Sequence, residues 1–220
     1  MTKNKSNTVT SNVAFSDHLA ATVTRGDQVV GFSESLRDGR AAAGDVQGNG
    51  TLDYSFTGRT STGEQGTLET CSKLVQVLNS AEPAAVWAAP MLRMDIPHLD
   101  AQAVRLDGQA PTLDIQVVRA FADSAFWHQA HKNGHGQGVS VTPRDLAQQL
   151  RDAIELKVSR IPVQHRTELV LALNAIDSPI VAFDTVVDAF RIHHGSWTAA
   201  QGFSAVWLIG PMPGLTHRLA

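Results

Sequence analysis

Three polar residues, Asp100, Asp114 and Gln116, lie in or beside two short apolar runs within residues 99–119. If residues 112–119 form a strand, its side chains alternate between two faces, so Asp114 and Gln116 share one face. Carboxylates such as Asp100 and Asp114 are hard oxygen ligands that suit Mg²⁺. The first candidate chemistry is therefore that of polar side chains set side by side on one strand, with carboxylates of a kind that can bind a cation nearby in the sequence.

A turn separates the two acids. Asp107-Gly108 is a strong hairpin signal, because both residue types tolerate the positive φ angles of tight turns. On the expected strand, Leu113, Ile115 and Val117 lie on the face opposite to Asp114. The pattern predicts a hairpin with one apolar and one polar face.

A second candidate site is His128, His131 and His135, spaced three and four residues apart. On a helix these side chains would share a face and suit Zn²⁺. Gly134, Gly136 and Gly138, on both sides of His135, disfavour that helix, and there is no HExxH motif. A zinc-dependent hydrolase remains an alternative.

The elements before the hairpin are a helix and a strand. Ser61 and Glu64 have the spacing of a capping box, which predicts a helix from Ser61 to about Asn79. Its expected apolar stripe consists of Leu68, Cys71, Val75 and Leu78. The run AAVWAAPML after Pro83 predicts a buried strand.

The elements after the hairpin alternate between helix and strand. Thr142 and Pro143 predict a helix start, and Asp145 suits its first turn. The inner stripe of this helix is Leu146, Leu150, Ile154 and then Lys157, a charge at an apolar position. Residues 168–176 and 203–209 predict strands, and between them a third helix is expected from Ser178-Pro179 to about His194-Gly195.

The N-terminal region has a weaker pattern. Residues 1–12 are polar and are expected to form a disordered tail. Residues 13–60 form an extension with candidate strands at 27–32 and 51–56, and a Gly-rich loop at 44–50. Residues 61–220 are assigned to the main domain.

Composition excludes several classes of protein. The apolar fraction of 43% is ordinary for a globular chain of 220 residues, and no apolar run approaches the roughly 20 residues that span a bilayer. The polar start lacks a secretory signal core, and the lone Cys71 fits a reducing compartment, so we expect a cytoplasmic protein. A net charge of −3 disfavours nucleic-acid binding by bulk charge alone, so any such contact would be local, metal-assisted, or shared with a homodimer or partner protein that supplies basic surface.

The expected order from residue 61 is helix, three strands, helix, strand, and then a further helix and strand. With Asp100, the turn and Asp114-Ile115-Gln116, this order resembles the PD-(D/E)xK nuclease superfamily. The resemblance implies the restriction-endonuclease-like fold: a mixed central sheet flanked by helices, with an α-β-β-β-α-β core. It also implies Mg²⁺, or alternatively Mn²⁺, and cleavage of DNA. Glu69 or Glu64 would match the acid on the family's first helix.

Two departures from the family pattern concern the motif itself. Leu99 stands where the family usually has Pro, and Gln116 stands where it has Lys. Lys157 is a candidate to replace that Lys, since some members draw it from the following helix. Loss of the Lys would equally suit an inactive nucleic-acid-binding or structural member of the same fold.

The expected site performs phosphodiester hydrolysis. Asp100 and Asp114, with Glu69 and the carbonyl of Ile115, would hold a metal that makes a bound water nucleophilic near neutral pH. Gln116 would orient the attacking water, and Lys157 would add positive charge.

Each of these residues also has a structural interpretation. Asp100 fits a loop acid, and a solvent-facing sheet produces the alternation at Asp114. Glu64 fits a helix cap and Glu69 a solvated position. Lys157 fits a buried stem with its ammonium reaching water.

Overall fold

The computed structural model describes residues 8–15, 18–25, 28–36, 41–46, 51–57, 63–84, 86–108, 111–121, 135–139, 142–176, 183–210 and 213–220. The chain divides into two compact units. The second unit, which contains the candidate site, consists of residues 61–122, 142–178 and 182–220. Residues 135–139, within the range assigned from sequence to the main domain, belong to the first unit.

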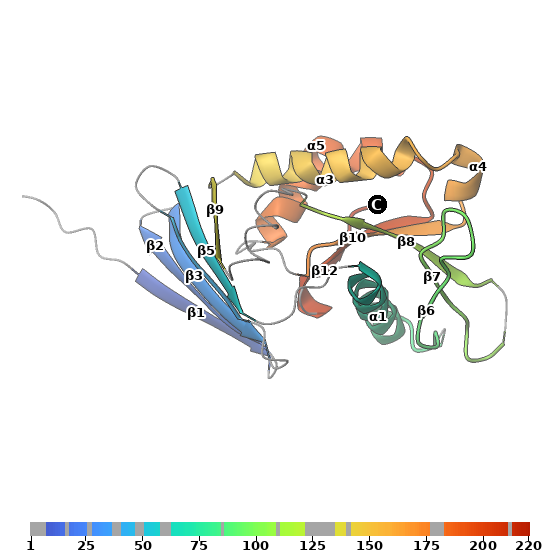
Figure 1. Cartoon of the computed structure of the whole chain (residues 1–220), viewed down its shortest axis with the longest axis horizontal. Helices are drawn as coiled ribbons and strands as arrows, with labels where there is room; N and C mark the ends of the chain where they lie inside the picture. The colour runs from blue at the N-terminus through green and yellow to red at the C-terminus, as the bar shows by residue number, and fades with distance from the viewer. Residues whose placement is uncertain are drawn as a thin grey trace, which may run out of the picture. The chain divides into compact units, whose positions relative to one another are not determined.

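The first unit is built on an antiparallel sheet in the order β1-β2-β3-β4-β5-β9 (Figure 1). The predicted strand at 51–56 is confirmed as part of β5, and the one at 27–32 is confirmed from Gln28 as part of β3, with Asp27 outside the described residues. Residues 8–12 lie in β1 although the sequence predicts disorder there, and residues 44–46 lie in β4 although it predicts a loop. The strands are β1 (Thr8–Phe15), β2 (His18–Arg25), β3 (Gln28–Leu36), β4 (Ala41–Val46), β5 (Thr51–Thr57) and β9 (His135–Val139).

The second unit has a six-stranded mixed sheet in the order β12-β11-β10-β8-β7-β6. The central pairs β8–β10 and β10–β11 are parallel, and the outer pairs are antiparallel. The mixed α/β class expected from the sequence is confirmed. The strands are β6 (Met91–Leu92), β7 (Ala101–Ala103), β8 (Leu113–Arg119), β10 (Leu169–Asn174), β11 (Ala205–Ile209) and β12 (Thr216–Arg218), with a 3₁₀ turn η1 (Pro213–Leu215) before β12.

Helices cover both faces of this sheet (Figure 1). Helix α1 (Gly63–Ala81) lies on one face, and α3 (Pro143–Val158) lies beside α5 (Phe183–Ala199) on the other, with the short α4 (Val163–Arg166) after α3. β10 is buried almost throughout because both of its faces are covered. The part of the chain that is described holds no helix long and apolar enough to cross a membrane.

Helix α1 packs its buried side chains against β7, β8 and β10. Cys71, Leu74 and Val75 belong to one apolar cluster with residues of these strands, Ala101 and Ile115 among them. The predicted stripe is wrong at Leu68, which is 38% exposed, while Leu74 is fully buried. The inward face is therefore rotated from the one that we expected.

Helix α3 begins as the sequence predicts. Thr142 is the N-cap, Pro143 lies in the first turn, and Thr142 and Asp145 exchange the two hydrogen bonds of a capping box. Leu150 and Ile154 are fully buried on the inner side, and Lys157 follows them in the last turn.

Two predicted boundaries are wrong. Helix α5 continues through Gly195 to Ala199, and the glycine with positive φ after it is Gly202 (φ +83°). Among the described residues of the run after Pro83, only Met91–Leu92 form a strand, with one isolated bridge between Trp87 and Arg105. A glycine inside a helix lowers the stability of that helix by about 1 kcal/mol relative to alanine, and tertiary packing outweighs this cost at Gly195.

Candidate functional site

The β7–β8 hairpin carries the sequence-predicted residues on paired strands. Gln102 on β7 is directly opposite Asp114 on β8, and Asp100 immediately precedes β7. Gly108 in the connecting segment has φ +73°, as the Asp107-Gly108 signal predicts. Alternation along β8 places Asp114 and Gln116 on the same face, while Ile115 is fully buried on the α1 side.

Asp100 is surrounded by donors from three directions. Its Oδ2 accepts hydrogen bonds from the Gln116 side-chain amide and from the backbone N–H of Val117, the latter at 2.7 Å. The Lys157 ammonium lies 4.0 Å from the same oxygen, with the Asp100 side chain 22% exposed. The structure therefore brings together Asp100, Gln116 and Lys157.

Lys157 reaches this group because α3 ends beside the strand. Burial lowers the pKa of Lys157, and the charge of Asp100 opposes that shift by favouring the ammonium. A half-buried ammonium beside a carboxylate is a fixed positive charge next to the acids. This is the side chain that the sequence singled out as a replacement for the missing motif Lys.

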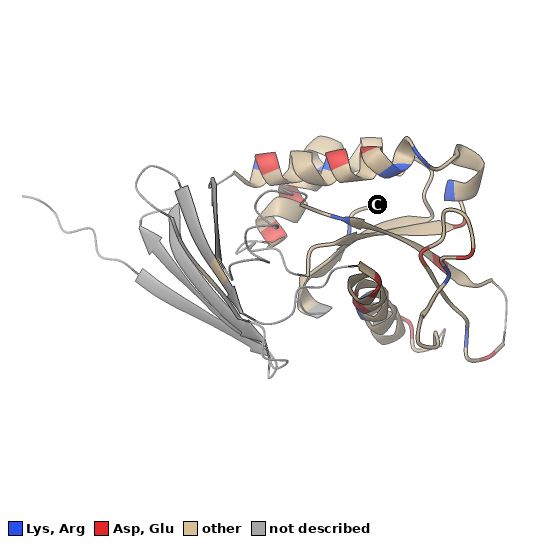
Figure 2. Ribbon diagram, in the orientation of Figure 1, with Lys and Arg blue, Asp and Glu red and all other residues tan. Residues whose placement is uncertain are grey.

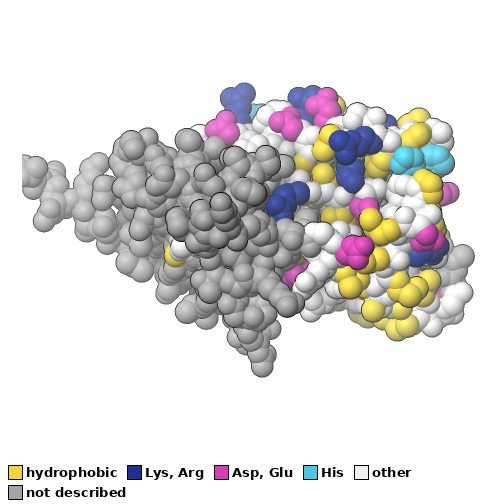
Figure 3. All heavy atoms as spheres, in the orientation of Figure 1, with side chains coloured by type: hydrophobic (Ala, Val, Ile, Leu, Met, Phe, Trp, Pro, Cys, Tyr) yellow, Lys and Arg dark blue, Asp and Glu magenta, His cyan; other side chains and the backbone are white. Residues whose placement is uncertain are grey.

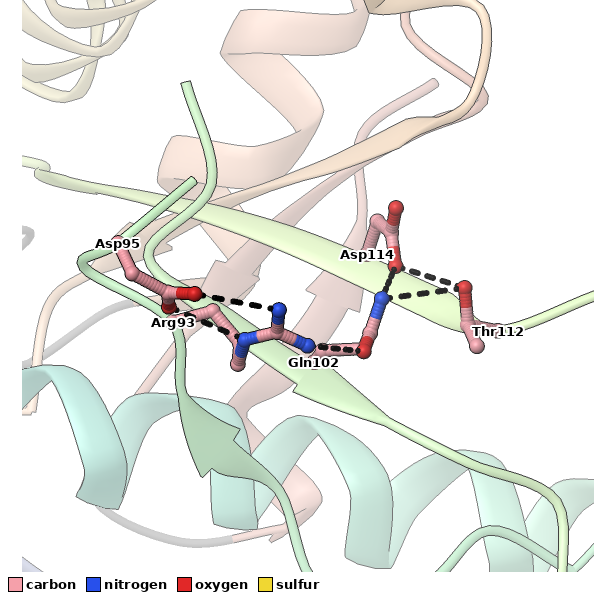
Figure 4. Close-up of polar contacts among 5 residues, drawn as sticks. All are labelled: Arg93, Asp95, Gln102, Thr112 and Asp114. Atoms are coloured by element: carbon pink, nitrogen blue, oxygen red, sulfur yellow. Dashed lines mark hydrogen bonds and ion pairs between the residues drawn. The ribbon is translucent and has the colours of Figure 1, made fainter. Parts of the chain in front are cut away.

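Asp114 is held by a separate network (Figure 4). Its Oδ1 accepts hydrogen bonds from Gln102 Nε2 at 2.8 Å and from the Thr112 hydroxyl at 2.9 Å. Arg93 donates from Nη1 to Gln102 Oε1 at 2.8 Å and makes an ion pair with Asp95. Because guanidinium is only a donor, Arg93 fixes the Gln102 amide with its NH₂ toward Asp114.

Each of the two acids has one carboxylate oxygen outside these hydrogen bonds. Among the described residues no hydrogen bond is made to Asp100 Oδ1 or Asp114 Oδ2. Two carboxylates with water fit Mg²⁺, which commonly keeps several waters and takes few protein ligands. The Ile115 carbonyl, also expected as a ligand, accepts a hydrogen bond from the Asp100 N–H at 3.1 Å.

The helix acids are not brought into the group. Glu69 lies 3.9 Å from Lys73 on α1 itself, and Glu64 is exposed in the first turn. Within the described ranges, no three His, Cys, Asp or Glu side chains are grouped closely enough to hold a metal ion. A cation would therefore depend on Asp100 and Asp114, with the remaining ligands from water or substrate.

The histidine alternative falls largely outside the described residues. His128 and His131 lie in a segment that the structure does not describe, and His135 is the first residue of β9, in the first unit.

Cys71 on α1 packs against the sheet, near enough to Asp100 to sense its charge. Burial, together with the negative charge of Asp100, raises the pKa of the Cys71 thiol to about 12. Since the thiolate is the reactive form, a fully buried neutral thiol is inert at neutral pH. Cys71 is a small core residue, as the sequence pattern predicts.

The sequence did not single out Gln102, which hydrogen-bonds Asp114, or Arg93, which hydrogen-bonds Gln102. Gln102 has a readable signal, because it is a polar residue between two alanines of a strand and must share a face with its cross-strand partner. Arg93 has no such signal, since it follows β6 in a turn whose approach to Gln102 is set by the fold.

Comparison of the chain with protein-family models, with curated proteins and with solved structures finds no match in any of the three.

Proposed function

We propose that the protein is a Mg²⁺-dependent nuclease that hydrolyses phosphodiester bonds in DNA, with Asp100 and Asp114 as metal ligands. The observation that carries the proposal is Lys157, whose ammonium lies 4.0 Å from Asp100 and beside Gln116. A helix thus supplies a cation next to the position where the resembled motif has its Lys.

The order of elements supports the same proposal. Within the second unit, helix α1 is followed by β6, β7 and β8, then by α3, the short α4 and β10, which lies parallel to β8; β9 intervenes in the chain but belongs to the first unit. This is the α-β-β-β-α-β order that the resemblance implies, with Asp100 before the second of these strands and Asp114 on the third.

The roles of the side chains follow from their contacts. A Mg²⁺ ion bound to Asp100 and Asp114 would lower the pKa of a water and polarise a phosphoryl oxygen. Lys157 holds a positive charge beside Asp100. That charge would stabilise the negative charge that develops on the phosphate during cleavage. Gln116 fixes the orientation of Asp100 through its amide, and Gln102 does so for Asp114.

A second candidate function is nucleic-acid binding without cleavage. It is favoured by the hydrogen bonds that already satisfy one oxygen of each carboxylate, from Gln116 and Val117 on Asp100 and from Gln102 on Asp114. Acids held this way also serve as structural ion-pair partners.

A cleavage assay separates the two functions. Supercoiled plasmid DNA is incubated with protein and Mg²⁺ or Mn²⁺, and nicked product is measured for the wild type and for Asp114→Ala. Loss of one ligand should lower cleavage by at least about a hundredfold. DNA binding without nicking at any metal concentration would support the second function and contradict the first.

A further inference from the structure

Arg93 is connected to Asp114 through Gln102 in a chain of side-chain hydrogen bonds (Figure 4). Gln102 donates from Nε2 to Asp114 Oδ1 at 2.8 Å, and its Oε1 accepts from Arg93 Nη1, also at 2.8 Å. An ionised carboxylate only accepts hydrogen bonds and a guanidinium only donates them. The Gln102 amide therefore has one orientation that satisfies both of its partners.

Asp95 holds the outer end of this chain. Its carboxylate accepts hydrogen bonds from two other nitrogens of Arg93, Nε at 3.1 Å and Nη2 at 3.3 Å. Such a bidentate pair fixes the plane of a guanidinium, and the remaining Nη1 is then directed at Gln102. The Asp95 side chain is 70% exposed, so this ion pair contributes little to the stability of the fold.

The strand pairing explains why these side chains meet. Arg93 immediately follows β6, and its N–H donates at 3.0 Å to the carbonyl of Asp100, which immediately precedes β7. Gln102 on β7 is directly opposite Asp114 on β8. The backbone thus holds Arg93 beside one candidate acid, while its side chain bonds the residue that holds the other.

The surroundings of Arg93 carry charges of both signs. Figure 2 shows Lys and Arg beside Asp and Glu in the segments around β6 and β7, and Figure 3 shows both kinds among hydrophobic side chains on one face of the second unit. In such a surface, one guanidinium gives little long-range attraction for an anionic ligand. The contacts of Arg93 that can matter to the site are therefore its hydrogen bonds.

The charge of Arg93 opposes the binding of a cation at Asp114. The hydrogen bond to Asp95 raises the pKa of Arg93, and the charges of Asp95 and Asp114 raise it further, so the guanidinium stays charged. A positive charge near Asp114 repels a cation bound to that carboxylate. Arg93 can therefore favour a cation there through position and not through charge.

We propose that Arg93 is a positioning residue for Asp114, and that it acts by fixing the Gln102 amide against the carboxylate that would bind Mg²⁺. The proposal rests on the proposed function for the identity of the ligand. Gln102 and the Thr112 hydroxyl both donate to Asp114 Oδ1, so they hold the carboxylate with Oδ2 outside these hydrogen bonds. Loss of such a partner of a metal-binding carboxylate lowers metal affinity by roughly 10- to 100-fold.

The test measures Mn²⁺ affinity in the absence of DNA, by electron paramagnetic resonance. The wild type is compared with Arg93→Met and with Gln102→Met. We expect each variant to bind Mn²⁺ roughly tenfold more weakly than the wild type. If Arg93 acted through its charge alone, Arg93→Met would bind Mn²⁺ more tightly. Equal or tighter binding by Arg93→Met would overturn the proposal.

A double variant shows whether Arg93 acts through Gln102. In the Gln102→Met background, Arg93→Met should lower the Mn²⁺ affinity no further, because the amide that Arg93 fixes is already gone. An equal loss in both backgrounds would overturn the proposal. Arg93→Lys keeps a donor for Gln102 but lacks the fork that pairs with Asp95, so its affinity should lie between those of the wild type and Arg93→Met.

Arg105 supplies a matched control. It makes the same kind of ion pair with an aspartate two residues on, from Nε and Nη2 to the carboxylate of Asp107 at 3.1 Å and 2.6 Å. Among the described residues its side chain also donates to the Ala84 carbonyl, and it makes no hydrogen bond to Gln102. Arg105→Met should bind Mn²⁺ as the wild type does, and a loss equal to that at position 93 would overturn the proposal.

A metal-free measurement follows the amide itself. In isotope-labelled protein observed by NMR, the side-chain NH₂ of Gln102 is assigned by its absence in Gln102→Met. It should exchange with water more slowly in the wild type than in Arg93→Met, because both ends of the amide are then held. The Tm of Arg93→Met should change little, since the ion pair is exposed. Equal exchange in the two proteins would overturn the proposal.

Failure of this proposal is distinguishable from failure of the proposed function. Weaker Mn²⁺ binding in Arg93→Met and Gln102→Met, with no DNA cleavage by any protein, keeps the positioning role and rejects the nuclease. Magnesium-dependent cleavage, with the Mn²⁺ affinity of Arg93→Met unaltered, keeps the nuclease and rejects the positioning role. A wild-type protein that binds no Mn²⁺ rejects both.

Discussion

Asp100 contributes both to the electrostatics of the candidate site and to the stability of the second unit. Its Oδ2 accepts two hydrogen bonds and lies 4.0 Å from the half-buried ammonium of Lys157. Removing one partner of a partly buried pair leaves the other charge uncompensated, and that penalty exceeds the net value of the pair. Asp114 is hydrogen-bonded to the neutral side chains of Gln102 and Thr112, and its charge acts on Arg93, which lies at the surface beside Asp95.

We therefore predict different effects of two conservative substitutions. Asp100→Asn should lower the free energy of unfolding by about 1–3 kcal/mol, and Asp114→Asn by about 1 kcal/mol or less. Urea denaturation measures both. In a double-mutant cycle, Lys157→Met should cost less in the Asp100→Asn background than in the wild type. Additive effects would show that the Asp100–Lys157 pair contributes no coupling.

Cys71 gives a prediction for alkaline pH. The pKa of its thiol is raised from 9.0 to about 12, so the folded state keeps a proton that the unfolded state releases. The contribution of Cys71 to stability is complete below pH 9 and is lost as the pH rises toward 12. Compared with Cys71→Ala, the wild type should lose up to about 1.4 kcal/mol per pH unit in that window. Parallel pH dependences for the two proteins would contradict the raised pKa.

At the scale of elements, α3 is predictable because its signals are local. Thr142, Pro143 and Asp145 define its start within four residues, and the apolar period then places Lys157 on the inner side. The end of α5 was not predictable, since packing extends that helix past Gly195 to Ala199. Likewise, only the three-dimensional approach of the turn after β6 brings Arg93 to Gln102.

The capping box of α3 provides a test at this scale. Thr142→Ala should lower stability by about 1 kcal/mol at neutral pH, since the N-cap acceptor is lost. The hydrogen bonds from Thr142 lower the pKa of Asp145, so the contribution of that carboxylate is present above its ordinary value of 3.8 and is lost at lower pH. The difference between wild type and variant, measured by thermal denaturation, should shrink in acid. A constant difference would contradict the role of Asp145.

Across the whole chain, the strands of the two sheets differ in how well the sequence predicts them. The second sheet is built from apolar runs separated by capped helices, so its strands β8, β10 and β11 and its mixed α/β class follow from periodicity. The first sheet uses Ala-, Gly-, Ser- and Thr-rich strands with weak alternation, such as AAAGDV in β4. At one edge of this sheet β5 pairs with β9, which is far from it in sequence. A local sequence pattern cannot predict a pairing between such distant strands.

Part of the candidate group follows from the sequence for the same reason. Asp100, Gln116 and Lys157 were readable because each breaks an apolar pattern, and the structure brings them together. Glu69 and Glu64 were chosen by position on a helix alone, and that helix directs its buried face, with Cys71 and Leu74, toward the apolar side of the hairpin.

The most direct test of the proposed nuclease moves the positively charged side chain from position 157 to position 116. Plasmid nicking with Mg²⁺ is compared in the wild type, Lys157→Met, and the double variant Lys157→Met with Gln116→Lys, after Tm has shown that all three are folded. If Lys157 supplies the charge that the resembled motif takes from its own strand, Lys157→Met should lose at least about tenfold in rate, the share of one positioned charge, and Gln116→Lys should restore much of it. Wild-type nicking that persists unchanged in Lys157→Met, or no nicking by the wild type with either Mg²⁺ or Mn²⁺, would contradict the claim.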